Sequence, residues 1–244
     1  MKNQYPQIIG RIRQLGLAAL LTTGLASQAQ TPLFTGHTDV GIAYAEGINE
    51  WELHGHDEET NTEYFPATDA LLVVKYDAHT TVTAGAQWSF LGSVGSSTWI
   101  LPQSEDPNLL FLGIGAEEIA DGIFAGDTLS LALRGVSGPG TFALYELDPF
   151  GDPIVRWNSA DGFTGADVLS VPTGGHSHFN WAFSAPGDYT VTLEAFGISV
   201  LNGATSSGNV DYLFRVEAVP EPAAGALAGV GTLAWWLARR NKRN

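Results

Sequence analysis

The sequence predicts an all-β fold, namely an antiparallel β-sandwich of immunoglobulin-like or jelly-roll-like type, and three observations lead to this prediction. Apolar and polar residues alternate in short segments, as expected for strands that bury one face; the clearest are 127–134, 141–147 and 189–195. Turn sequences rich in glycine and proline separate the strand candidates, for example 137–140 and 185–188. No long segment of helical period occurs outside the two ends of the chain. About ten strand candidates joined by short turns favour a sandwich.

Other segments between the two ends fit the same fold. Residues 70–76 and 109–112 are apolar without alternation, which is typical of strands buried on both faces. Residues 116–120 predict a single helical turn. Tyr189 follows a Pro-Gly turn and begins a strand, an arrangement common at the corners of immunoglobulin-like sandwiches. We therefore expect residues 30–218 to form one surface domain, since about 190 residues suit a single domain.

The N-terminus has the three parts of a secretory signal peptide. Basic residues (Lys2, Arg11 and Arg13) precede an apolar run from Leu15 to Leu25. The small residues of 26–29 then offer a cleavage site after Ala29. Residues 1–29 therefore predict a signal helix that a signal peptidase removes.

The C-terminus, residues 219–244, also has three parts. The motif Val219-Pro220-Glu221-Pro222 comes first, and an apolar stretch over 223–238 predicts a hydrophobic helix. A basic cluster within 239–243 follows; it consists of Arg239, Arg240, Lys242 and Arg243. The apolar stretch has 16 residues, fewer than the roughly 20 that span a bilayer comfortably. We expect transient insertion into the inner membrane, with the basic cluster on the cytoplasmic side.

These C-terminal residues resemble the PEP-CTERM sorting signal of bacteria. The resemblance implies that an exosortase-type enzyme processes the chain near the Pro-Glu-Pro motif. The protein is then expected to be secreted and to reach the cell surface or the extracellular matrix. A plain single-pass anchor is the alternative interpretation of the same residues.

The composition of the expected domain excludes some classes of partner. The whole chain has a formal charge of −15, but residues 30–218 hold only four basic residues against 25 acidic ones, which gives −21. Such a surface repels nucleic acid and attracts cations. The chain contains no cysteine, so a disulfide framework and a thiolate metal site are both excluded.

The histidines carry the chemical hypothesis. Two His-x-His pairs occur, His54 with His56 and His176 with His178, and residues two apart on a strand project from the same face. If the two strands are neighbours, four imidazoles converge into a cage for zinc or another divalent transition metal. His37, two residues before Asp39, can complete or orient the site. The alternative is that these histidines are solvent-facing polar positions.

Five segments resemble the choice-of-anchor M domain, a family of bacterial surface domains: 36–40, 51–57, 115–119, 145–151 and 175–183. The resemblance spans most of residues 34–217. It implies a β-rich surface domain, and the association of related proteins with metal-type transporters implies metal handling. The residues that it points to are His37, His54, His56, His176 and His178.

We expect a non-enzymatic surface or matrix protein, because neither a nucleophile elbow nor a phosphate loop occurs in the sequence. The acidic runs 57–59 and 117–118 are interpreted as a solvated face. The alternative function is a carbohydrate-binding module or a weak hydrolase that acts on extracellular polysaccharide. In that case Trp88, Trp99 and Trp157 are the candidates for stacking on sugars, although a core position is the other interpretation of each.

Overall fold

The computed structural model describes residues 30–221 of the chain. The expected signal peptide (1–29) and most of the sorting tail, including Pro222 and the basic cluster, lie outside the described residues. The described part contains 17 strands and three short 3₁₀ helices, η1 (Glu46–Ile48), η2 (Tyr76–Ala78) and η3 (Ala86–Leu91). The prediction of a β-rich fold is therefore confirmed.

The strands form three sheets. Sheet A runs β1 (Thr31–Leu33), β5 (Ala70–Val74), β17 (Val210–Val216), β15 (Gly187–Ser199), β9 (Thr128–Ser137), β12 (Val168–Pro172), and β16 (Gly203–Ser206) pairs with β15. Sheet B runs β13 (His176–His178), β8 (Leu110–Gly115), β2 (Gly36–Ala45), β3 (Glu50–Asp57), β4 (Thr62–Tyr64). Sheet C runs β11 (Pro153–Asn158), β10 (Phe142–Leu147), β14 (Asn180–Phe183), β7 (Ser97–Leu101), β6 (His79–Thr81).

The pairing is mixed, so the expectation of purely antiparallel sheets is wrong. Strand β5 pairs in parallel with both β1 and β17, and β2 pairs in parallel with β8. Parallel neighbours need a crossover of a dozen or more residues. Here the chain between β2 and β8 supplies one by building β3 to β7 first. Such long-range pairing leaves no signal in local periodicity.

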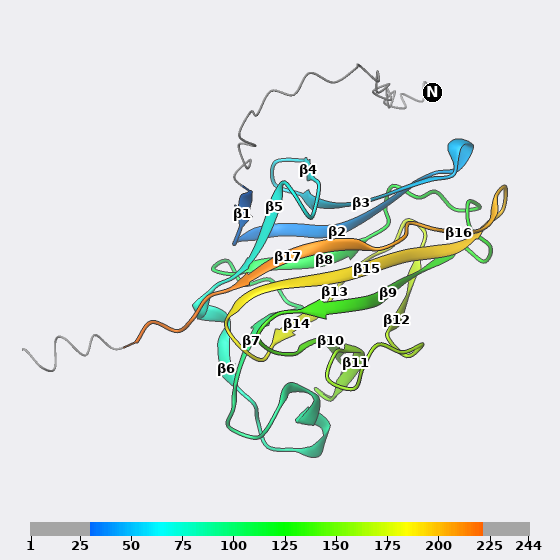
Figure 1. Ribbon diagram of the computed structural model, residues 1–244. Helices are drawn as coiled ribbons and strands as arrows, with labels where there is room; N and C mark the ends of the chain where they lie inside the picture. Colours follow the sequence, from blue (N-terminus) through cyan, green and yellow to red (C-terminus); the bar gives the residue numbers. More distant parts are fainter. Residues whose placement is uncertain (1–29, 222–244) are drawn as a thin grey trace, which may run out of the picture.

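One hydrophobic core joins the three sheets. The ring of Phe214 on β17 in sheet A lies with its centroid 5.9 Å from Trp181 and 5.2 Å from Phe183, both on β14 in sheet C. Sheet A also contacts sheet B, because the Tyr212 hydroxyl donates a hydrogen bond to the His54 carbonyl (3.1 Å). Sheet A thus packs against both other sheets, an arrangement consistent with a sandwich; its long strands β15 and β17 cross the middle of Figure 1.

The chain changes sheets at Phe179, between β13 in sheet B and β14 in sheet C. Asn180 follows His178 by two residues but belongs to sheet C, away from the two histidines. Its amide donates to Gln103 Oε1 (2.8 Å), and its oxygen accepts from the Gln103 backbone N–H (3.1 Å).

The helical turn predicted over 116–120 is wrong. These residues form a non-helical turn that the hydrogen bond from Ile119 N to Ala116 O (3.0 Å) closes.

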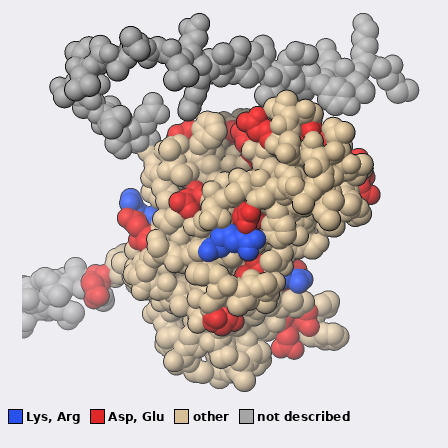
Figure 2. Space-filling model, turned by 45° about the vertical axis from the view of Figure 1, so that its right-hand side comes forward, with Lys and Arg blue, Asp and Glu red and all other residues tan. Residues whose placement is uncertain are grey.

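The surface of the described part is acidic. In the view of Figure 2, acidic side chains are scattered over the domain and few basic ones lie between them. Within residues 30–221, no helix has the length and hydropathy needed to cross a bilayer.

The shared core yields a stability prediction. Replacing Phe214→Ala is expected to lower the free energy of unfolding by about 3–5 kcal/mol, because it removes a fully buried ring at the contact between two sheets. The matched control is Phe150→Ala, since Phe150 is 91% exposed, and we expect a change within about 0.5 kcal/mol. Urea unfolding monitored by tryptophan fluorescence measures both values. Equal small effects would contradict a core shared by sheets A and C.

Candidate metal centre

The outer face of sheet B gathers most of the histidines. On β2, Val40 and Ile42 point into the core, so His37, Asp39 and Gly41 point outward by strand alternation. The register carries the same face across the sheet: Gly41 lies opposite His54 on β3, and Asp39 lies opposite Gly113 on β8. On β13, His176 pairs with Gly115 and His178 pairs with Gly113. Five histidines therefore project from one face: His37, His54, His56, His176 and His178.

Glycines make room for these side chains. The strands of the two His-x-His pairs are not neighbours, because β8 and β2 lie between them. A Cβ on Gly113 would lie 2.1 Å from Asp39 Oδ1 and 2.7 Å from His176 Nε2. A Cβ on Gly41 would lie 2.3 Å from His54 Nε2. The imidazoles thus lie over backbone that carries no side chain.

The first group of possible metal ligands consists of His37, Asp39, His176 and His178, whose donor atoms lie within 4.8 Å of one another. His37 Nε2 is 3.3 Å from both His176 Nε2 and Asp39 Oδ1. His176 Nε2 is 3.0 Å from the same carboxylate oxygen. Tetrahedral zinc with ligand bonds of about 2.0–2.1 Å separates its ligands by about 3.3 Å. These three atoms already have that spacing.

The second nitrogen of His176 shows how the imidazole is oriented. Its Nδ1 lies 2.9 Å from Glu117 Oε1, on the turn after β8. A neutral imidazole has one proton and can donate it to one carboxylate only. If Nδ1 donates to Glu117, then Nε2 faces Asp39 with a lone pair, and a cation between the two satisfies both. A carboxylate that orients a ligating histidine in this way is typical of metal sites.

Burial strengthens the case for Asp39 and His178. Asp39 is 2% exposed, and its Oδ2 has no hydrogen-bond partner among the described residues. Burial raises the pKa of Asp39, although the nearby His176 and His37 oppose this shift. The ring of His178 stacks on Phe111, with centroids 3.6 Å apart. Burial, followed by the charges of His176 and His37, lowers the pKa of His178 to about 4. His178 is therefore neutral at physiological pH, the form in which histidine binds metals.

A second group lies on the same face and consists of His54, Glu63 and Glu118. His54 is 2% exposed, and its Nε2 lies 3.3 Å from Glu118 Oε1. Burial lowers the pKa of His54, but the contact with Glu118 and the charges of Glu118, Glu63 and Glu52 outweigh it and raise the pKa. The same contact with His54 lowers the pKa of Glu118.

The predicted cage of four imidazoles is therefore divided. His176 and His178 join His37 and Asp39, whereas His54 belongs to the second group. His56 belongs to neither group, because its Nε2 lies 3.2 Å from Asn61 Oδ1 and its Nδ1 lies 3.2 Å from Glu58 Oε1.

Several contributors to the site were not identified from the sequence. Glu117 and Glu118 were expected on a solvated face, yet each contacts an imidazole. Gly41, Gly113 and Gly115 were not singled out. A Gly-x-Gly sequence inside a buried apolar strand was the available signal, since glycine in a strand often marks a close approach of other groups.

The tryptophans considered for sugar stacking divide in a similar way. Trp99 and Trp157 are buried in the core, so they are not available for stacking. Trp88 is half-buried and lines a hollow of about 700 Å³ beside η3.

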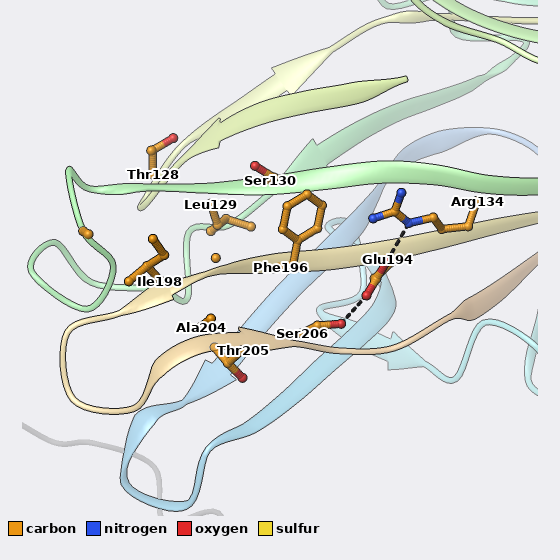
Figure 3. A pocket seen from close by; sticks show the side chains of 12 residues that line it. Thr128, Leu129, Ser130, Arg134, Glu194, Phe196, Ile198, Ala204, Thr205 and Ser206 are labelled. Atoms are coloured by element: carbon orange, nitrogen blue, oxygen red, sulfur yellow. Dashed lines mark hydrogen bonds and ion pairs between the residues drawn. The ribbon is translucent and has the colours of Figure 1, made fainter. Parts of the chain in front are cut away.

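A separate groove of about 640 Å³ lies on the outer face of sheet A, where Phe196 is flanked by Arg134 and Ser130 (Figure 3).

Comparison with known proteins identifies the C-terminal segment. A family model described as the PEP-CTERM protein-sorting motif matches residues 218–243. No curated protein and no solved structure matches the chain. The match supports an exported protein that an exosortase sorts to the cell surface. The resemblance of residues 34–217 to the choice-of-anchor M domain stays a prediction.

The role of Gly113 in making room for the imidazoles can be tested directly. Gly113→Ala is expected to lower the free energy of unfolding by about 1–3 kcal/mol, because the new methyl group overpacks the site. It should also shift the imidazole NMR signals of His176 and His178. The control Gly165→Ala meets no atom within 4 Å, and we expect an unchanged or slightly higher stability, by up to about 1 kcal/mol. Unmoved histidine signals in Gly113→Ala would show that the glycine does not make room for the group.

Proposed function

We propose that this exported surface domain binds one divalent transition metal ion, zinc before copper or nickel, through His37, Asp39, His176 and His178. The observation that carries the proposal is the 3.0–3.3 Å spacing of three donor atoms on the outer face of sheet B. Three imidazoles and one carboxylate suit zinc in tetrahedral geometry. His37 and His178 come from different strands, so the folded sheet assembles the ligand set.

The ligand set favours a binding role over catalysis. Catalytic zinc keeps an open position for water or substrate, whereas four protein ligands close the tetrahedral shell. The domain is therefore proposed to be non-enzymatic, as the sequence predicts.

The location of the protein agrees with this role. The charge of −21 over residues 30–218 attracts cations to the surface. A protein sorted to the surface or the extracellular matrix meets metal ions before the cell imports them. The resemblance to choice-of-anchor M domains adds the same expectation of metal handling.

The groove on sheet A supports a second candidate function, the binding of extracellular polysaccharide. Phe196 lies beside the guanidinium of Arg134, which is 5.4 Å from the ring centroid, and the hydroxyls of Ser130, Thr205 and Ser206 also line the groove (Figure 3). Aromatic and hydroxyl groups together suit a sugar. Glu194 is the one carboxylate among the lining residues, so the acid–base pair of a glycosidase is not formed there.

Zinc titration tests the first candidate. The full chain, purified in detergent without a polyhistidine tag, is titrated by calorimetry beside His176→Ala/His178→Ala and the control His79→Ala. His79 lies on β6 in sheet C and bonds with Ser97 Oγ. We expect high-affinity binding in the wild type and the control. In the double variant we expect a loss of more than about 100-fold, since even the loss of a group that orients a ligand costs 10- to 100-fold.

Equal affinity in all three proteins would overturn the proposed site. A glycan array with the same wild-type chain tests the second candidate. Retention that Phe196→Ala abolishes would support it, and the absence of any retained glycan would count against it.

Processing at the C-terminus forms a separate prediction. In a host with a matching exosortase, Glu221→Ala/Pro222→Ala is expected to accumulate in the membrane fraction, because the variant lacks the sorting motif. The wild-type chain should be released from the membrane fraction. The control Glu217→Ala, which lies outside the matched residues, should be released to the same extent. Immunoblots of the fractions measure the distribution, and identical distributions for all three chains would contradict sorting through this motif.

A further inference from the structure

We infer that the outer face of sheet B holds a second divalent cation at His54, Glu63 and Glu118. The inference rests on the proposed function in that it extends metal binding to a second position on the same face. It uses none of the four residues proposed for the first ion, and different observations carry it.

The first observation is an unpartnered buried imidazole. His54 is 2% exposed; its Nδ1 has no partner among the described residues, and its Nε2 faces only the Glu118 carboxylate. Leaving a buried polar group unpaired costs about 1–3 kcal/mol. The backbone around it is well fixed, because Tyr212 bonds to the His54 carbonyl from sheet A. The ring is thus held with one nitrogen that no described protein group satisfies and the other turned toward a carboxylate.

The second observation is the pair of carboxylates beside this ring. Glu118 Oε1 lies 3.3 Å from His54 Nε2. Glu63 comes from β4, where it lies opposite His56. Donor atoms of His54, Glu63 and Glu118 all lie within 4.8 Å of one another. Once a cation has displaced any proton from the imidazole, the two carboxylates carry two negative charges, which balance a divalent ion.

The third observation is the space around the group. Gly41 lies beneath the ring, and a Cβ there would meet its Nε2, Cδ2 and Cε1 atoms at less than 3 Å. A hollow of about 300 Å³ lined by His54, Glu118 and Glu117 opens beside it. The hollow leaves room for water molecules to complete a coordination shell.

The two positions differ in chemistry. The first group offers three nitrogens and one oxygen, whereas the second offers one nitrogen and two oxygens. Carboxylates suit manganese and imidazole suits zinc, so the second position is expected to accept both. Glu63 and Glu118 are solvent-exposed, and with three protein ligands the ion exchanges faster than one held by four.

Counting bound ions tests the inference. The full untagged chain is dialysed against zinc, and the bound metal per chain is measured by mass spectrometry. The same measurement is made on Glu63→Gln/Glu118→Gln, on His176→Ala/His178→Ala and on the control Glu105→Gln, an exposed carboxylate outside both groups. The glutamine variants keep the shape of each side chain, and circular dichroism checks that every variant is folded.

We expect two ions per chain in the wild type and the control, and one in each double variant. One ion in the wild type that Glu63→Gln/Glu118→Gln retains would overturn the second position and leave the first intact. If the wild type binds one ion, Glu63→Gln/Glu118→Gln binds none and His176→Ala/His178→Ala still binds one, the first position is overturned instead. A manganese titration followed by electron paramagnetic resonance adds an independent test, in which only Glu63→Gln/Glu118→Gln should lose the bound signal.

Discussion

The pleat of sheet B is the constraint on which the rest of the structure depends. Successive residues of a strand point to opposite faces, so a strand such as β2 supplies both the core and the candidate site. On β2, Val40 and Ile42 pack in the core while Asp39 points outward. A shift of one residue would exchange the two sets. The burial of the apolar residues therefore fixes the register that brings the candidate metal ligands together.

The glycines of β2 and β8 make this arrangement possible across non-neighbouring strands. Imidazoles on β3 and β13 cannot approach the middle of the sheet if side chains stand between them. Gly41 and Gly113 remove that obstacle. The result is costly without a cation, because buried atoms such as Asp39 Oδ2 and His178 Nδ1 have no hydrogen-bond partner within residues 30–221. An ion bound by the proposed ligands would offset that cost, so metal binding is expected to stabilise the fold.

Local pattern predicted the strands and the direction of their side chains, and it could not predict which strands meet. Alternation over 127–134 and 189–195 corresponds to β9 and β15. The spacing of His176 and His178 correctly placed both on one face. The sheet order, however, depends on a parallel pairing between β2 and β8 that no local periodicity encodes. For that reason His37 became a central member of the first group, and His54 fell into another.

Charge patterns were harder to interpret from the sequence than apolar patterns. Glu117 and Glu118 look like a solvated run, and only the turn after β8 brings them to His176 and His54. His56, in contrast, was expected to be a metal ligand, but its nitrogens face Glu58 and Asn61 instead of the other candidate ligands.

Metal binding by the first group is the central claim, and a crystal of the zinc-soaked protein tests it most directly. Anomalous difference maps collected on both sides of the zinc edge locate the ion without assumptions about its ligands. We expect a peak about 2.0–2.1 Å from nitrogens of His37, His176 and His178 and about 2.0–2.2 Å from an Asp39 oxygen. A map with no peak among these four residues would contradict it.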